Sequence, residues 1–117
     1  MDNYEFARKL EARLLIFTKN VSDLCFSSSK NFRNSNIIDQ LLRSSSSVGA
    51  NYIEANEAIS KKDFFHRIKI CRKESKESIY WLELLAHTNS DRKEKTDVLI
   101  KEASEYLRLF SAIINKS

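Results

Sequence analysis

The sequence predicts an all-α protein that folds as an antiparallel up-and-down four-helix bundle. Its 117 residues include one glycine and no proline, whereas sandwiches, barrels and tight hairpins depend on these residues for their turns. Apolar residues recur at steps of three and four along most of the chain, which is the period of one helix face. The length suits one hydrophobic core, so we expect a single domain over residues 1–117.

The first predicted helix covers residues 3–26 and the second covers residues 36–59. The apolar stripe of the first consists of Leu10, Leu14, Phe17, Val21 and Leu24. The stripe of the second consists of Ile38, Leu41, Ser45, Val48, Tyr52, Ala55 and Ile59. Residues 27–35 are rich in Ser and Asn, which bond to their own backbone outside helices. We therefore expect a loop there, with Asn36 as the N-cap of the second helix.

The third predicted helix covers residues 61–87 and the fourth covers residues 91–115. Ser60 and Asp63 match a capping box, so the third helix opens almost directly after the second. Such a short connection favours antiparallel neighbours. Asp91, followed three residues later by Glu94, is the expected cap of the fourth helix. The third stripe is Phe64, Ile68, Cys71, Ser75, Ser78, Leu82 and Leu85, and the fourth is Leu99, Ala103, Tyr106, Phe110 and Ile113.

A second, polar stripe follows the second helix one residue away from the apolar stripe. Its members are Gln40, Ser44, Ser47, Asn51 and Glu54, and Arg43 lies close enough to Ser47 to join them. This stripe is either a solvated face or a close contact with another helix, in which Asn51 and Glu54 fix the register. Gly49 on the same helix favours close packing. Both interpretations are structural and neither is catalytic.

Four apolar side chains of the third helix lie off its main stripe: Ile70, Tyr80, Trp81 and Leu84. Scattered exposed apolar groups are normal on monomers. An off-core cluster of Trp, Tyr and Leu on a rigid helix is, however, typical of subunit interfaces. We therefore expect these four residues to form the interface of a homo-oligomer.

The sequence offers no catalytic or metal site. A carboxylate-bridged bundle centre needs two Glu-x-x-His pairs, and this chain has none and only two histidines. The serines lack a nucleophile elbow, and a single glycine excludes glycine-rich phosphate loops. We expect no enzyme, no metal and no cofactor.

The two cysteines, Cys25 and Cys71, fall far apart within apolar helical patterns. We interpret both as reduced core thiols of a cytoplasmic protein. Neither a signal peptide nor a membrane-spanning run of about 20 apolar residues is expected, so the membrane is not a predicted partner.

The net charge of +4 is concentrated at the start of the third helix. Residues 61–76 contain seven basic and two acidic side chains. We name the seven the basic band: Lys61, Lys62, Arg67, Lys69, Arg72, Lys73 and Lys76. Such a band neutralises phosphates through counterion release without reading sequence, which predicts nonspecific RNA or DNA binding. An ordinary solvated lysine-rich face is the alternative.

The middle of the chain resembles a known family. The segments that carry the resemblance are QLLRS at 40–44, SVGANYIEA at 47–55, SKKDF at 60–64 and ESIYWLELL at 77–85. Together they are similar to the bacterial four helix bundle proteins, also called 23S rRNA intervening-sequence proteins. The resemblance places Arg43, Ser44, Ser47, Asn51 and Glu54 on the signature of the family's second helix, and Lys61 and Lys62 on its Ser-Lys segment.

The resemblance implies a small bundle that assembles into a homopentameric ring and has no enzymatic activity. A related group consists of accessory proteins of diversity-generating retroelements, which bind a reverse transcriptase and nucleic acid. Taken with the charge pattern, we expect a non-enzymatic oligomeric module that binds RNA or DNA through the basic band. The alternative is a protein-binding scaffold or accessory subunit with no nucleic-acid affinity.

Overall fold

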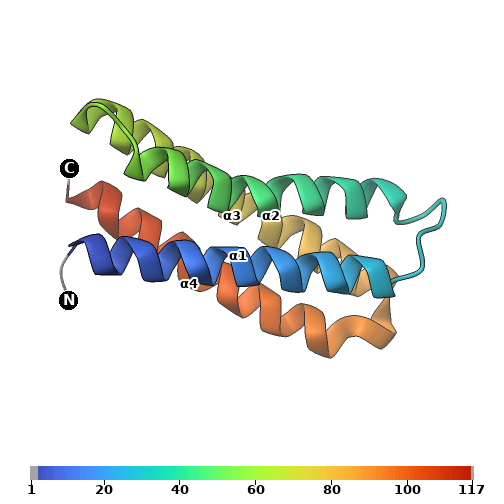
Figure 1. The fold of residues 1–117 in the computed structure, drawn as a ribbon. Coiled ribbons are helices and arrows are strands. Elements are labelled where there is room, and N and C mark those ends of the chain that lie inside the picture. The colour runs from blue at the N-terminus through green and yellow to red at the C-terminus, as the bar shows by residue number, and fades with distance from the viewer. Residues whose placement is uncertain (1–2, 117) are drawn as a thin grey trace.

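The computed structural model, which describes residues 3–116, consists of four long helices (Figure 1). They are α1 (Asn3–Ser27), α2 (Ser35–Asn56), α3 (Lys61–Thr88) and α4 (Lys93–Asn115), with a short 3-10 helix, η1 (Ser90–Arg92), before α4. Consecutive helices run antiparallel, so both ends of the chain lie at the same end of the molecule. The prediction of an all-α, antiparallel four-helix arrangement is confirmed.

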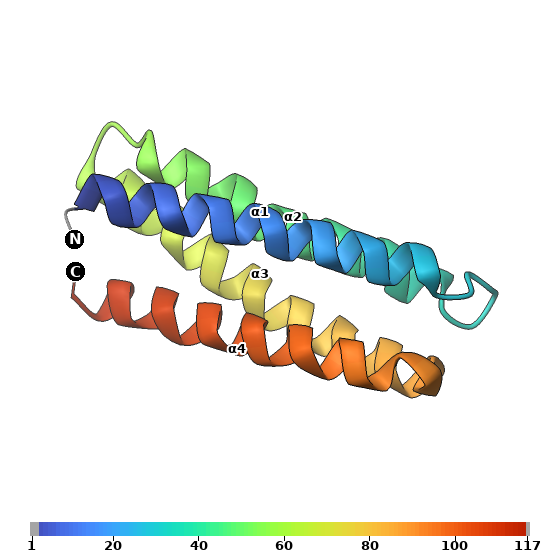
Figure 2. The ribbon, with the colours of Figure 1, turned by 60° about the horizontal axis from the view of Figure 1, so that its bottom comes forward.

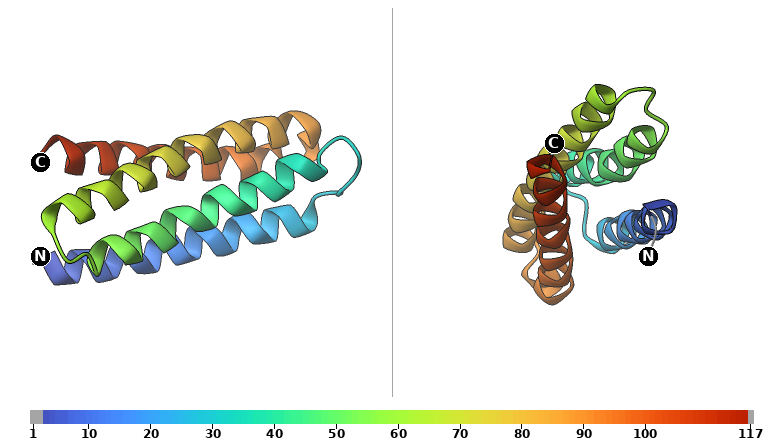
Figure 3. Two further views of the ribbon diagram at one scale, coloured as in Figure 1. Left: turned by 90° about the horizontal axis from the view of Figure 1, so that it is seen from above. Right: turned by 90° about the vertical axis from the view of Figure 1, so that its left-hand side faces the viewer.

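The helices are long relative to the molecule. The 28 residues of α3 rise about 42 Å at 1.5 Å each, which matches the 44 Å long axis of the chain. Contacts are most extensive where α3 packs on α2 and α4, and much sparser between α1 and α4. The end-on view in Figure 3 shows α1 beside α2, with α3 and α4 together on the other side. In Figure 2, α3 is visible behind and between α1 and α4.

The core consists largely of the predicted stripes. All five stripe residues of α1 are buried, and the ring of Phe17 meets the ring of Tyr106 on α4 edge-on at 5.4 Å between centroids. Tyr52 on α2 contacts Phe110 on α4 at 6.0 Å. The serines of the α2 and α3 stripes, Ser45, Ser75 and Ser78, are buried as well. Ser78 hydrogen-bonds to Ser44 of α2, so the α2–α3 contact contains small side chains that let the two backbones approach.

The helix predicted over 36–59 ends at Asn56 instead, and Ile59 is 97% exposed. The amides of Glu57 and Ala58 donate to the carbonyls of Glu54 and Ala55 at 3.2 and 3.1 Å, a tightened final turn. A helix continued to residue 59 would leave no chain for the reversal into α3, which the short loop from 57 to 60 provides. The predicted end was wrong because the apolar spacing of the α2 stripe continues to Ile59, about one turn beyond the last helical residue.

The three predicted caps had different outcomes. Ser60 caps α3 as predicted, its hydroxyl accepting a hydrogen bond from the Asp63 amide at 3.0 Å. The Asn36 cap was wrong, since α2 already begins at Ser35. The Asp91 cap was also wrong, because Asp91 lies in η1 and α4 begins after Arg92 without a side-chain cap.

The α1–α2 loop is closed by the buried Asn34, at the N-cap position of α2. Its side chain bonds to the loop and not to the helix: Oδ1 accepts from the Asn31 amide at 2.9 Å, and Nδ2 donates to the Ser29 carbonyl at 2.6 Å. These bonds compensate the burial of the amide. The asparagine at the N-cap position of α2 is therefore Asn34 and not Asn36, and its side chain hydrogen-bonds to the preceding loop instead of the first turn of the helix.

Candidate nucleic-acid interface

The basic band occupies the N-terminal half of α3. Four of its members, Lys62, Lys69, Lys73 and Lys76, follow one another at steps of seven, four and three and are all exposed. Residues at these steps share one helix face. The buried residues Ile68, Cys71 and Ser75 define the opposite face. The structure therefore unites the four lysines in one outward row, which we call the lysine row.

The other three members of the band lie to either side of the lysine row. Arg67 is half-buried and donates from Nη1 to Oδ1 of Asn51 at 3.1 Å, so it belongs to the contact between α2 and α3. Lys61 and Arg72 are exposed and lie on the side of the lysine row nearer α4. The band is thus a row of four lysines with two flanking cations and one arginine committed to packing.

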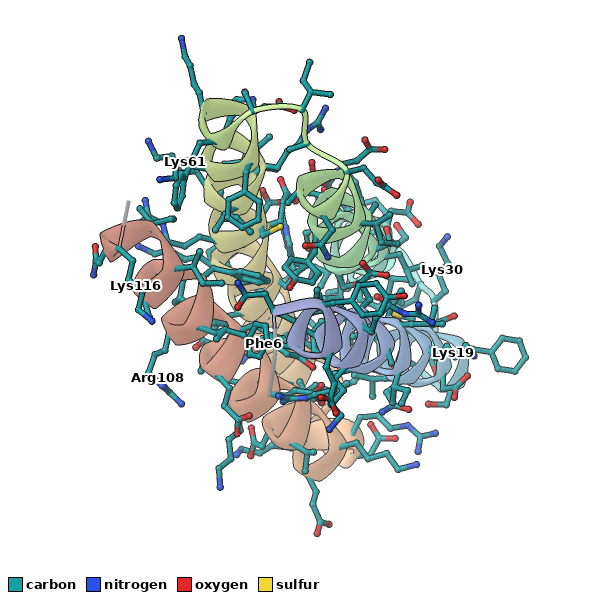
Figure 4. The ribbon with its side chains drawn as sticks, turned by 60° about the vertical axis from the view of Figure 1, so that its left-hand side comes forward. Phe6, Lys19, Lys30, Lys61, Arg108 and Lys116 are labelled. Atoms are coloured by element: carbon teal, nitrogen blue, oxygen red, sulfur yellow. The ribbon has the colours of Figure 1, made fainter. Side chains whose placement is uncertain are left out.

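Two cations of α4 lie on the same side of the molecule as Lys61 and were missed by sequence reasoning. Because α3 and α4 are antiparallel, the end of α4 lies beside the start of α3. Figure 4 shows Lys61, Arg108 and Lys116 projecting from one side of the molecule, with Lys19 and Lys30 on the opposite side. Counting charges in short windows of the sequence cannot reveal that residues 61 and 116 lie on the same side of the molecule, because they are far apart in the chain. The antiparallel order of the helices was the available signal.

The acidic residues near the lysine row are mostly engaged elsewhere. The buried carboxylate of Glu74 pairs with Nη1 of Arg43 at 3.0 Å, and Lys73 Nζ is 3.8 Å from its other oxygen. Asp63 lies at the N-terminus of α3, where a carboxylate complements the helix dipole. Within residues 3–116, Lys73 is the one member of the lysine row with an ion pair. The charge of the row therefore remains largely available to a ligand.

The polar stripe of α2 divides between a helix contact and solvent. Ser44 is fully buried against Ser78 of α3, and Arg43 pairs with both Glu74 and Glu77 of α3. Asn51 bonds to Arg67 and, within α2, to the hydroxyl of Ser47 at 2.9 Å. Glu54, by contrast, is exposed. Ser44 and Asn51 of the stripe, together with Arg43, therefore connect α2 to α3, whereas Glu54 faces water.

The four residues expected at a subunit interface differ in burial. Ile70, Trp81 and Leu84 are half-buried, whereas Tyr80 is 57% exposed. The indole Nε1 of Trp81 donates to a carboxylate oxygen of Glu77 at 2.9 Å. The rings of Tyr80 and Trp81 meet edge-to-face at 5.0 Å. Tyr80 continues the face of Lys73 and Lys76, while Trp81 is turned by about 100° toward α2.

Comparison with known proteins places the chain in a family. A family model described as "23S rRNA-intervening sequence protein" matches residues 12–112, which is most of the chain. The chain belongs to this family. A crystal structure of a protein of unknown function from the S23 ribosomal protein family of Bacteroides thetaiotaomicron is similar, with a TM-score of 0.78 and 31% sequence identity. The match covers 93% of this chain and 97% of that one. No curated protein is significantly similar in sequence.

This member of the 23S rRNA-intervening sequence protein family has two buried thiols. Burial raises the pKa of Cys25 to about 11 and that of Cys71 to about 12. Both thiols are therefore protonated at neutral pH, where a nucleophile or metal ligand would have to be a thiolate. In the part of the chain the structure describes, no three His, Cys, Asp or Glu side chains gather where they could hold a metal ion.

None of the helices within residues 3–116 combines the length and the apolar character needed to cross a bilayer. A surface groove lies where α1 and α4 separate. Two adjoining hollows of about 470 and 460 Å³ meet there at Val98. Val98 is 64% exposed and Ile16, across the groove, is 56% exposed. This groove is distinct from the lysine row, since α4 faces it with the side that carries Glu102 and Glu105.

Proposed function

We propose that this family member is a non-enzymatic, cytoplasmic helical module that assembles from several copies and binds RNA or DNA without sequence specificity. The observation that carries the proposal is the lysine row, four exposed cations on one face of α3. Lysines that neutralise phosphates release condensed counterions, which drives association with any nucleic acid. Phosphate contacts position a protein on its ligand but carry no base information.

The neighbouring surface supports this proposal. Arg108 and Lys116 of α4 project on the same side as Lys61, so cations of two helices face this side of the molecule. Two acidic residues of α4 lie beside α1: Glu105 pairs with Arg13 at 3.4 Å, and Glu102 lines the groove toward α1 and accepts a hydrogen bond from the Tyr106 hydroxyl. Repulsion of a phosphate backbone by these carboxylates is therefore reduced on the lysine side.

We also propose that the module is a homopentameric ring, as the resemblance to its family implies. Ile70, Trp81 and Leu84 supply half-buried apolar surface on α3, the composition found in the cores of subunit interfaces. A ring contact is heterologous, so each copy presents the same surface in the same orientation to the assembly. The lysine rows of the copies would then act together on one strand.

Binding measured at two salt concentrations tests the proposal. The affinity for a labelled oligonucleotide should be measurable at about 50 mM salt and fall steeply by about 200 mM, as counterion release requires. Absence of binding at the lower salt concentration would remove the nucleic-acid function. Reversal of Arg72, Lys73 and Lys76 to Glu should weaken binding at both concentrations.

A matched pair of single variants locates the surface. Lys69→Glu and Lys19→Glu each change the net charge by the same amount, but Lys69 belongs to the lysine row and Lys19 lies on the opposite side. We expect Lys69→Glu to weaken binding and flatten its salt dependence, and Lys19→Glu to have little effect. Equal losses in the two variants would show that net charge, and not this surface, drives association.

A protein-binding scaffold is the second candidate function. The groove between α1 and α4 favours it, because Ile16 and Val98 expose apolar surface in a hollow flanked by charged side chains. A sample that ignores nucleic acid but loses a protein partner on Val98→Glu would support this candidate.

A further inference from the structure

We infer that the nucleic acid bound by the lysine row is single-stranded, and that the ring of Tyr80 is the platform on which one of its bases stacks. The inference rests on the proposed function, since it names the form of nucleic acid that the same surface takes. Three observations carry it: Tyr80 lies on the same helix face as the lysines, its side chain is exposed, and its ring is held by contact with Trp81.

Tyr80 extends the lysine row by one helical turn. It lies four residues after Lys76 and seven after Lys73, so all three share one face of α3. From Lys62 to Tyr80 the row runs about 27 Å along the helix at 1.5 Å per residue. A row of cations that follows a backbone, combined with an aromatic side chain that receives a base, is how proteins bind single strands without sequence preference.

The ring of Tyr80 is held in place as well as exposed. Its neighbour Trp81 contacts it edge-to-face at an interplanar angle of 78°. Trp81 is in turn fixed by its hydrogen bond to Glu77, which pairs with Arg43 of α2. This chain of contacts restrains the Tyr80 ring while 57% of the residue remains exposed. An aromatic platform restrained before binding loses less side-chain entropy when a base stacks on it.

A duplex would leave this platform unused. The bases of a duplex are stacked on one another, and only phosphates and groove edges reach the convex surface of a helix such as α3. The lysine row alone would then account for binding. A single strand presents unstacked bases beside its phosphates, so it engages both the lysines and Tyr80.

The same geometry argues against placing Tyr80 inside a subunit interface. Burying Tyr80 would also bury Lys76 and Lys73, its neighbours on the same face, and lysine is depleted from interface cores. Ile70 and Trp81 lie on the side of α3 nearer α2 and can pack against another copy without covering the row. We therefore assign Tyr80 to the lysine row, and Ile70 and Trp81 to the interface.

The experiment compares ligands and two Tyr80 variants. Fluorescein-labelled U and dT oligonucleotides of about 20 nucleotides, and a duplex of about 20 base pairs, would be titrated with the assembled protein. We expect both single strands to bind more tightly than the duplex. Tyr80→Leu should weaken single-strand binding about tenfold, a typical loss for one stacked base, without changing the salt dependence or duplex affinity. Tyr80→Phe keeps the ring and should bind as the wild type does.

The single tryptophan, Trp81, provides an independent readout. Because its ring contacts Tyr80, single-strand binding should change the Trp81 emission and duplex binding should not. Light scattering on Tyr80→Leu should show the wild-type mass. A changed mass would make Tyr80 an interface residue and overturn the inference.

The remaining outcomes separate the inference from the proposed function. Equal affinity for duplex and single strands, or single-strand binding unaffected by Tyr80→Leu, overturns the stacking platform but leaves phosphate binding by the lysine row intact. Failure of every oligonucleotide to bind at low salt removes the proposed function itself.

Discussion

The buried hydroxyls of Ser44 on α2 and Ser78 on α3 lie 2.9 Å apart and share a hydrogen bond across the helix contact. Ser78 also lies 2.9 Å from the carbonyl of Glu74, one turn earlier on α3. The pair satisfies two polar groups that have no access to water. It also marks a point where two helices approach through small side chains.

Enlarging one member of this pair should separate the helices. Ser44→Leu adds volume to a position with no exposed surface, so we expect a loss of about 1–3 kcal/mol in the free energy of unfolding. Ser44→Ala should cost less, because the Ser78 hydroxyl can still donate to the Glu74 carbonyl. Urea unfolding of the three proteins measures both changes. Equal stability of Ser44→Leu and the wild type would contradict close packing at this point.

Gly49 is predicted to be replaceable with a gain in stability. A Cβ built at this position of α2 would lie 3.6 Å from the Cβ of Leu14 on α1, an ordinary van der Waals contact. Since glycine inside a helix costs about 0.5–1 kcal/mol relative to alanine, Gly49→Ala should raise the free energy of unfolding by that amount. The exposed neighbour gives the control: Ala50→Gly should lower it by a similar amount. Thermal unfolding followed by circular dichroism compares them.

The apolar stripe of α1 and the glycine at position 49 of α2 show which features of the packing the sequence could and could not predict. The stripe from Leu10 to Leu24 predicted the buried face of α1 because helical period and burial are directly coupled. The lack of a side chain at Gly49 implied close packing there, and the structure leaves room beside it for a methyl group in van der Waals contact with Leu14. Periodicity reports which direction a residue faces. It does not report the distance to the neighbouring helix, which depends on side chains from another part of the chain.

The candidate site was predictable in part for the same reason. The lysine row follows from spacing within one helix, so its shared face could be derived before the structure was known. Arg67 could not be separated from the row, because its bond to Asn51 depends on how α2 and α3 are rotated against each other. Arg108 and Lys116 required the antiparallel pairing of α3 and α4. Features within one helix and the antiparallel order of the helices were predictable, whereas the rotation of one helix against another was not.

The two buried thiols predict a loss of stability in mildly alkaline solution. Burial raises the pKa of Cys25 and Cys71 above the ordinary value of 9.0, to about 11 and about 12. Above pH 9 the unfolded chain releases these protons while the folded chain retains them, so the unfolding free energy falls as pH rises. Each thiol contributes a slope of about 1.4 kcal/mol per pH unit until the pH reaches its folded pKa.

Urea unfolding at pH 7 and at successive values above pH 9 measures this dependence. Cys71→Ala removes one of the two thiols and should reduce the slope between about pH 9.5 and 10.5 by about 1.4 kcal/mol per pH unit. The comparison with the wild type cancels the titration of lysines and tyrosines, which both proteins share. An unchanged slope would mean that the Cys71 thiolate is accommodated in the folded chain.

Trp81 is predicted to be an anchor of the assembly. Its ring is half-buried in the single chain and lies one helical turn before Leu84 on α3, so a second copy would complete its burial. Light scattering at micromolar concentration should give about five times the 13.6 kDa chain mass for the wild type, and a lower mass for Trp81→Ala.

The control is Phe32→Ala, which truncates an aromatic side chain that is fully exposed in the α1–α2 loop and should leave the mass unchanged. Because Trp81 also packs against the core, circular dichroism must show that Trp81→Ala remains helical before its mass is interpreted. A folded Trp81→Ala protein with the full wild-type mass would place the subunit contact elsewhere on the molecule, and a wild type with the mass of one chain would exclude the ring.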